Sequence, residues 1–191
     1  MKQALAFLIL LPLQAQTAYQ PITTSERWAE FRKDNFTTPA AYVGALGPAL
    51  YSQVDHSYSP WPLGAEGYAR RTGYFYGMGL IESSIRHSTA AALGNEVRYE
   101  RSNKTGLFPR AGHAIGRNFV TRNRQGHLTP NVSTFMSSYG SGMLSTYMLP
   151  QRFQPTVFGV QQGHIIFSAS AGLNLFREFS PDLKKLVRRH K

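Results

Sequence analysis

The chain has 191 residues, a formal net charge of +11 at pH 7 and a pI of about 10.2. It contains no cysteine, which excludes a disulfide scaffold, a thiolate metal site and a cysteine nucleophile. The positive charge favours anionic partners, such as anionic lipid, a phosphate-bearing polymer or nucleic acid. Aromatic residues make up 13% of the chain. That is too many for a disordered basic tail, so we expect a folded chain.

Residues 1–16 are typical of a signal peptide. Lys2 supplies a positive charge, an apolar run extends from Ala4 to Leu13, and Ala15 offers a small residue for cleavage. An apolar run of about ten residues is too short for a membrane-spanning helix. We therefore expect an exported protein of the periplasm or cell envelope, with residues 17–191 as a single helical domain. An uncleaved anchor and a buried N-terminal helix are the alternatives.

The next part of the chain has the pattern of two helices. Hydroxyl residues followed by acids predict a short helix over residues 25–36. Its aromatic residues are expected on the inner side: Trp28, Phe31 and Phe36. Pro39 then begins a second helical run, because proline is tolerated in the first turn. Pro48 lies inside this run and should kink or end it.

Small residues recur at helical spacing in three later segments. The segments are 65–93 with Gly73 and Gly77, 132–148 with Ser137, Ser141 and Ser145, and 158–176 with Gly159 and Gly163. Each interior glycine costs about 1 kcal/mol relative to alanine. A close helix contact that a larger side chain would block can offset this cost. We therefore expect the second and third segments to pack tightly on the first. A short basic helix should follow, with Ser180 as its cap and Pro181 at its first position.

Together these patterns predict an all-α fold, a compact bundle of four to six helices with Gly, Ser and Ala at the helix contacts. Strand signals are poor, since the chain has no sustained alternation and no Asn-Gly or Asp-Gly hairpin. The mean hydropathy is −0.30. Polar residues such as Glu82, Arg86 and Gln162 lie inside the predicted helices, and they favour a compact bundle that is soluble or rests on a membrane. An embedded bundle stays open as the alternative.

Positive charge gathers between Arg98 and His127. The cationic residues of this stretch are Arg98, Arg101, Lys104, Arg110, Arg117, Arg122 and Arg124. After Glu100 the next acid is Glu178. The pattern predicts a short amphipathic helix that starts near Ala111, with Arg110, His113 and Arg117 on or beside its start. The candidate anion-binding residues are Arg110, His113, Arg117, Arg122 and His127. The alternative is a solvated connection between helices.

Enzymatic signals are weak. The six histidines form no H-x-x-x-H pair, and no G-x-S-x-G element occurs. We therefore expect no metal and no cofactor, and the sequence assigns no catalytic residue. The elements Arg110, Gly112-His113, Thr121-Arg122 and His127 faintly resemble acid phosphatases of the phosphatidic-acid-phosphatase type. That resemblance implies a histidine nucleophile on phosphate. However, Pro109 precedes Arg110 and Ala111 replaces the serine of that family.

Four segments resemble a group of uncharacterised exported bacterial proteins. They are Tyr99-Glu100-Arg101-Ser102-Asn103, Arg110-Ala111-Gly112-His113-Ala114, Pro130-Asn131-Val132-Ser133 and Arg177-Glu178-Phe179-Ser180-Pro181-Asp182. The resemblance implies helical structure and export, without a known activity. The sequence therefore favours a non-enzymatic, envelope-associated protein that binds anionic lipid or phosphate groups. Export argues against nucleic acid as the partner. A membrane-type phosphoester hydrolase is the alternative.

Overall fold

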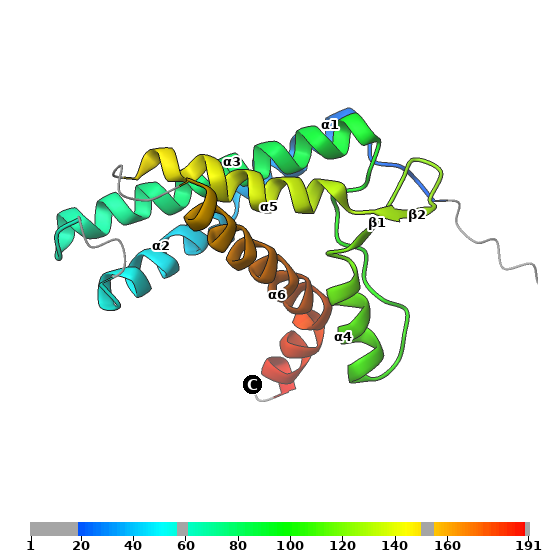
Figure 1. The fold of residues 1–191 in the computed structure, drawn as a ribbon. Coiled ribbons are helices and arrows are strands. Elements are labelled where there is room, and N and C mark those ends of the chain that lie inside the picture. The colour runs from blue at the N-terminus through cyan, green and yellow to red at the C-terminus, as the bar shows by residue number, and fades with distance from the viewer. Residues whose placement is uncertain (1–18, 57–60, 150–154, 190–191) are drawn as a thin grey trace, which may run out of the picture.

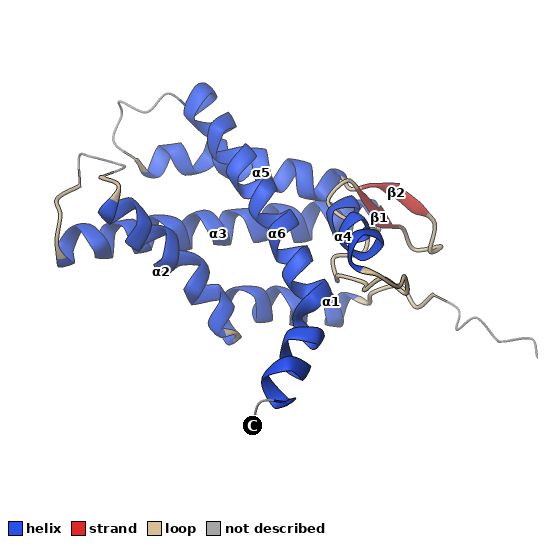
Figure 2. Ribbon diagram, turned by 90° about the horizontal axis from the view of Figure 1, so that it is seen from below, coloured by secondary structure: helices blue, strands red, loops and turns tan. Residues whose placement is uncertain are grey.

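The structure is a computed structural model that describes residues 19–56, 61–149 and 155–189. Within these ranges the chain forms six α-helices and one two-stranded hairpin (Figure 2). The prediction of an all-α helical bundle is confirmed. The predicted signal peptide, residues 1–16, lies outside the described residues.

The elements follow one another along the chain with short connections. They are α1 (Thr24–Arg32), a π-helical turn η1 (Lys33–Thr37), α2 (Pro39–Val54), α3 (Ala65–Leu93), α4 (Leu107–Gly116), β1 (Val120–Arg122), β2 (Leu128–Pro130), α5 (Val132–Ser145), a 3-10 turn η2 (Thr146–Met148) and α6 (Pro155–Arg189). The two strands are antiparallel, with Thr121 opposite Thr129. The sequence did not predict this hairpin, because strands of three residues are too short to show alternation.

Helix α3 is the centre of the arrangement. Helices α2 and α5 pack against α3, and α6 packs against α5 (Figure 1). Farther along, α6 leaves the other helices, and its C-terminal part meets α4 on the lower side of the molecule in Figure 1. The expected contact of the last helix with the 65–93 helix is therefore corrected, because the glycines of α6 face α5.

Helix ends follow the local sequence. Thr23 caps α1, since its side chain accepts from the Glu26 N–H while Glu26 accepts from the Thr23 N–H. Helix α3 ends at Gly94, whose φ of 68° is the left-handed conformation that glycine tolerates best. Pro48 does not end α2, which continues to Val54.

The two predicted C-terminal helices are in fact one, because α6 continues through Pro181. Proline has no N–H to donate to the carbonyl four residues earlier, so the Arg177 carbonyl loses its helical partner. Two side chains supply donors instead. Arg101 Nε and Ser180 Oγ each lie 3.3 Å from the Arg177 oxygen. These donors make a continuous helix tolerable at this position.

Glycine allows the close contact between α5 and α6. A Cβ added at Gly142 would lie 2.8 Å from the backbone nitrogen of Gly163. A Cβ at Gly163 would lie 2.5 Å from the ring of Tyr139. By contrast, Gly73 faces open space, and Gly77 faces only the end of the Met148 side chain. Close packing through small residues is therefore found mainly between α5 and α6.

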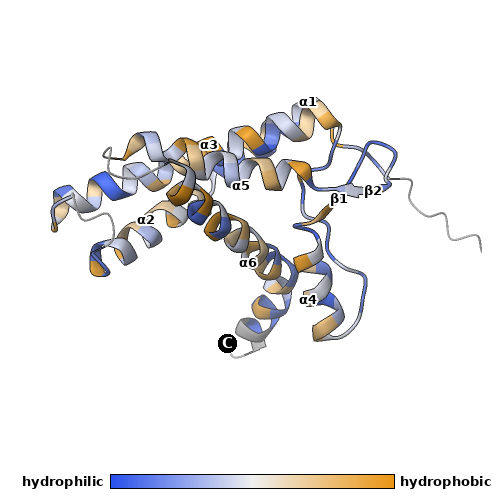
Figure 3. Cartoon of the chain, viewed as in Figure 1, coloured by the Kyte–Doolittle hydropathy of each residue, from blue (hydrophilic) through white to orange (hydrophobic). Residues whose placement is uncertain are grey.

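Small polar side chains fill much of the interior. Five serines of α5 are at most 2% exposed: Ser133, Ser137, Ser138, Ser141 and Ser145. The buried apolar residues of the described chain are Ala45, Ala49, Tyr74, Ala90, Ala114 and Leu149. Larger apolar residues lie mostly outside. Figure 3 shows hydrophobic residues along several of the helices, α5 and α6 among them. Trp28 and Phe36 are 58% and 47% exposed, so their predicted inward orientation is wrong. No helix in the described ranges is long and apolar enough to cross a membrane.

Candidate functional site

The central basic stretch folds into a loop, helix α4 and the β1–β2 hairpin. Helix α4 starts at Leu107, four residues before the predicted start at Ala111, and Gly106 precedes it with a φ of 88°. Arg110 and His113 lie on α4, and Arg117 is the residue that ends it. The three residues therefore lie on or beside one short helix, although at its middle and end rather than at its start.

Arg110 joins α4 to α6. Its Nε lies 3.0 Å from Glu178 Oε1, and its Nη1 lies 2.7 Å from Asp182 Oδ2. Its Nη2 donates to the Glu178 carbonyl at 2.9 Å, and the guanidinium covers the Phe179 ring. All three guanidinium nitrogens thus have acceptors within this chain. Arg110 holds two helices together, and it does not present a free guanidinium to an external anion.

Glu178 is the buried partner at the centre of this joint. It is 0% exposed, and it also accepts hydrogen bonds from Tyr99 Oη at 2.8 Å and from the Ser102 N–H at 3.1 Å. Burial alone would raise the pKa of Glu178, but the hydrogen bonds from Ser102, Arg110 and Tyr99 outweigh it and lower the pKa. Burial and the same carboxylate raise the pKa of Tyr99. The carboxylate is therefore held in its charged form.

Arg122 and His127 belong to the hairpin. Arg122 Nε lies 2.7 Å from Glu100 Oε2, and its Nη1 donates to the Gly126 carbonyl at 2.7 Å. His127 is exposed, and its backbone N–H donates to Asn123 Oδ1. Arg122, like Arg110, is engaged by an acid of this chain. The two hairpin residues take part in no contact with Arg110 among the described residues.

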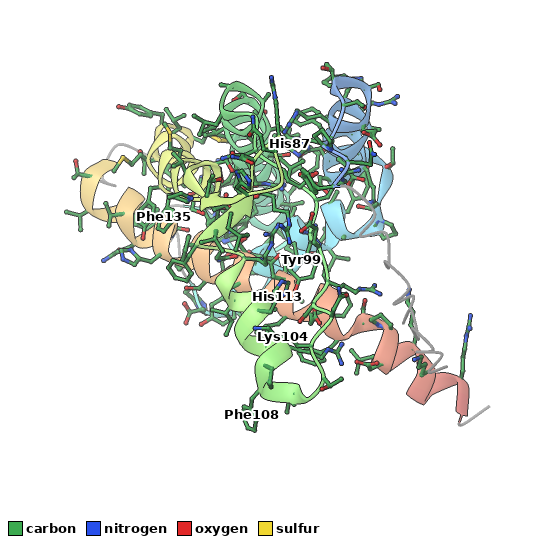
Figure 4. All side chains as sticks on the ribbon, turned by 90° about the vertical axis from the view of Figure 1, so that its right-hand side faces the viewer. His87, Tyr99, Lys104, Phe108, His113 and Phe135 are labelled. Carbon is green, nitrogen blue, oxygen red and sulfur yellow. The ribbon has the colours of Figure 1, made fainter. Side chains whose placement is uncertain are left out.

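His113 and Arg117 lie nearer the interior. The ring of His113 packs edge-on against Tyr99 (Figure 4), and burial together with the charge of Arg117 lowers the pKa of His113. His113 therefore gains a positive charge only at a lower pH than an ordinary imidazole does. The Arg117 side chain is 7% exposed, and its nearest carboxylate oxygen, Glu100 Oε2, is 3.8 Å away.

The exposed end of α4 has a composition that the sequence analysis did not single out. Phe108 is 85% exposed and Leu107 is 62% exposed. Figure 4 shows Phe108 at the far end of α4, with Lys104 on the adjoining loop. In Figures 1 and 4 this end and the C-terminal end of α6 both project from the same side of the molecule. We define the α4–α6 tip by these exposed residues: Lys104, Leu107, Phe108, Leu183, Lys184, Lys185 and Arg188.

A sequence signal for the tip existed. Leu107 and Phe108 are two large apolar residues beside Lys104, and they precede Pro109, which is tolerated in the first turn of a helix. The cluster of arginines marks this stretch by its charge, so the two apolar residues give the weaker signal. The acid nearest to the tip along α6, Asp182, is bound to Arg110.

The predicted residues thus separate into three places. Arg110 lies in the α4–α6 joint, Arg122 and His127 lie on the hairpin, and Arg117 lies inside the molecule. The two histidines of the phosphatase resemblance share no contact in the described part of the chain. Across the described ranges, no three or more His, Asp or Glu side chains are placed to hold a metal ion.

Comparison with models of protein families, with curated proteins and with solved structures finds no match for this chain. What the protein can do must therefore be inferred from its own residues.

Proposed function

We propose that the protein is exported and binds anionic lipid membranes peripherally through the α4–α6 tip. The main support is the exposure of Phe108 and Leu107 at the end of a helix whose neighbouring exposed charges are cationic. An apolar end flanked by lysine and arginine fits a surface of anionic headgroups above acyl chains. Residues 1–16, with the composition of a signal peptide, support export.

Two contributions add up at such a tip. Full burial of a Leu or Phe side chain stabilises by about 1.5–3 kcal/mol. Each Lys or Arg near an anionic leaflet contributes about 1 kcal/mol. The tip offers two such apolar residues on α4 and four cations, namely Lys104, Lys184, Lys185 and Arg188. Neither contribution alone gives stable binding, but the combination of both does.

Vesicle binding tests this proposal. Phe108→Ser should weaken binding to vesicles of phosphatidylglycerol and phosphatidylcholine about tenfold or more, because about 1.4 kcal/mol of apolar transfer energy is lost. The matched control is Tyr147→Ser, since Tyr147 is an aromatic residue that is 77% exposed in the η2 turn. Cosedimentation with vesicles at low and high salt measures both variants.

The expected result has three parts. Wild-type protein binds anionic vesicles, its binding falls with salt, and the Phe108 variant is weaker than the Tyr147 variant. Equal binding of the two variants would show that α4 does not enter the lipid. Equal binding to vesicles of phosphatidylcholine alone would show that the cations play no part.

A further inference from the structure

A large cavity, whose lining includes none of the tip residues, lies between α2, α3, α6 and the loop 97–101. Its volume is about 880 Å³, within the range of small-molecule sites in proteins. One part of its wall is apolar, with Val43, Phe75, Leu80, Leu173 and Phe176 among the lining residues. Another part is charged.

A second, smaller cavity of about 50 Å³ adjoins the large one at its charged part. The two cavities share Arg86, Val97, Arg98, Tyr99 and Arg177 as lining residues. Four arginines line the small cavity, namely Arg86, Arg98, Arg117 and Arg177, whereas Glu96 is its one acidic lining residue among those described. A space of this size admits a group of only a few heavy atoms.

Two of the four arginines have close acidic partners. Arg86 lies 3.0 Å from Asp34 and 3.2 Å from Glu82. Arg98 lies 2.8 Å from Glu96. These pairs are within hydrogen-bond distance, so the guanidinium groups of Arg86 and Arg98 are largely compensated.

Arg117 and Arg177 differ from Arg86 and Arg98 in the distance to their acidic partners. Their nearest carboxylate oxygens lie 3.8 Å away on Glu100 and 4.0 Å away on Asp34, which is too far for a hydrogen bond. Both carboxylates have closer cations, since Glu100 lies 2.7 Å from Arg122 and Asp34 lies 3.0 Å from Arg86. Burial lowers the pKa of both guanidinium groups. The Arg117 side chain is only 7% exposed, so a guanidinium group without a hydrogen-bonded acceptor is costly there, whereas the Arg177 side chain is 36% exposed and also reaches solvent.

An oxyanion supplies the acceptors that these two guanidinium groups lack. The Thr134 hydroxyl also borders the small cavity and donates no hydrogen bond to the described residues. We propose that the two cavities form one binding site for an amphiphilic anion. Its phosphate or carboxylate head binds between Arg117 and Arg177, and its apolar part lies in the large cavity. This inference goes beyond membrane binding at the tip and does not depend on it.

Calorimetric titration with three probes tests the chemistry. The probes are dodecyl phosphate below its critical micelle concentration, inorganic phosphate, and dodecyl maltoside as the uncharged amphiphile. Dodecyl phosphate should bind with a stoichiometry of one, at least about tenfold more tightly than inorganic phosphate, because only the former fills the apolar part. Equal affinity of the two phosphates would overturn the apolar half of the site. Absence of dodecyl phosphate binding, or equally tight maltoside binding, would overturn the oxyanion half.

Glycine variants of α3 test the location. Gly79 lines the large cavity, and a Cβ there would meet nothing within 4 Å. Gly79→Leu should therefore fill the cavity and weaken dodecyl phosphate binding at least about tenfold without lowering thermal stability. Gly73→Leu is the matched control, because Gly73 is an equally open glycine of α3 and is not among the lining residues. Equal binding by the two variants would overturn the proposed location.

Replacing the two unpaired cations tests the head group. Arg117→Met and Arg177→Met should each weaken dodecyl phosphate binding at least about tenfold. The melting temperature of the free protein should fall little, because Arg117 makes no hydrogen bond to a carboxylate and Arg177 is a partly exposed cation whose nearest carboxylate oxygen is 4.0 Å away. Unchanged binding in both folded variants would refute the assignment of the head group to Arg117 and Arg177.

The two proposed sites can be tested independently. Phe108→Ser should leave dodecyl phosphate binding unchanged, and Gly79→Leu should leave vesicle binding unchanged.

Discussion

Arg110 and Glu178 illustrate how single residues stabilise this protein. They are 68 positions apart in the sequence and join α4 to α6 through charged hydrogen bonds at a buried carboxylate. Removing one partner of a buried pair leaves the other without compensation. Within the basic stretch, Arg110 is therefore compensated by acids that lie far away along the chain, which its local composition could not show, whereas Arg98 and Arg122 are paired with the nearby Glu96 and Glu100.

The first prediction at this scale concerns pH. The pKa of Glu178 is lower in the folded protein than its ordinary value, so its contribution to stability is fully present above about pH 4.3 and is lost as the pH falls through the folded pKa. The melting temperature should therefore fall as the pH is lowered below about 4.3, the ordinary pKa of a glutamate. In Glu178→Gln this fall should be smaller, because the variant has lost the titrating group. Calorimetry at a series of pH values measures the melting temperatures of the wild type and the variant.

A surface pair provides the control for this experiment. Glu66 bonds to Arg70 while both side chains are more than half exposed, and exposed pairs contribute little. Glu66→Gln should therefore keep the pH dependence of the wild type. If Glu178→Gln also keeps it, the buried carboxylate does not stabilise the folded state as described.

Among the elements, the contact between α5 and α6 depends most on glycine. Gly142→Ala should lower the free energy of unfolding by about 1–3 kcal/mol, because the new Cβ would meet the backbone of α6, which cannot move cheaply. Gly73→Ala should raise it by up to about 1 kcal/mol, since that glycine faces open space. Urea denaturation of the two variants compares them directly.

Leucine variants refine the same prediction. Gly163→Leu should destabilise more than Gly77→Leu, because Gly163 faces the ring and backbone of Tyr139. Gly77 faces only the end of the flexible Met148 side chain, which can move aside. Equal losses in the two variants would contradict this reading of the helix contacts.

Local sequence predicted most of the helices but not how they pair. The predicted bounds of 65–93 match α3, because periodicity and the Gly94 stop are local signals. Pro181 was a misleading signal, since the donors that compensate for it come from Arg101 and Ser180. The acceptors of Arg110 likewise come from a distant helix. A candidate site made of arginines could therefore be located in the sequence, but its availability to a ligand could not.

At the scale of the whole molecule, the distribution of polarity is unusual. Serines fill the contact around α5, while many large apolar side chains are exposed. Where such side chains form a contiguous patch, they mark an interaction site in a folded protein. This distribution of polarity agrees with the proposed binding to a lipid membrane. The cations of the α4–α6 tip would make the tip the side that faces the membrane.

The expected export can be tested on the intact protein. The charge of Lys2, the apolar run and Ala15 predict cleavage, with the mature chain starting near Gln16 or Thr17. Intact-mass measurement of protein recovered from the envelope of expressing bacteria should show this start. A mass that retains Met1 would contradict cleavage, and recovery only from the cytoplasm would contradict export.

The serine and glycine interior also has an evolutionary consequence. Where backbones meet directly, as at Gly142 and Gly163, each core position admits little beyond hydrogen, a methyl group or a hydroxyl. Outer apolar positions tolerate exchange among Leu, Met, Phe and Val more readily, because solvent lies on one side of them. Divergent descendants of this chain should therefore preserve the register of small residues on α5 and α6 while their large hydrophobic residues drift. Related proteins would then be recognised by the spacing of their smallest side chains.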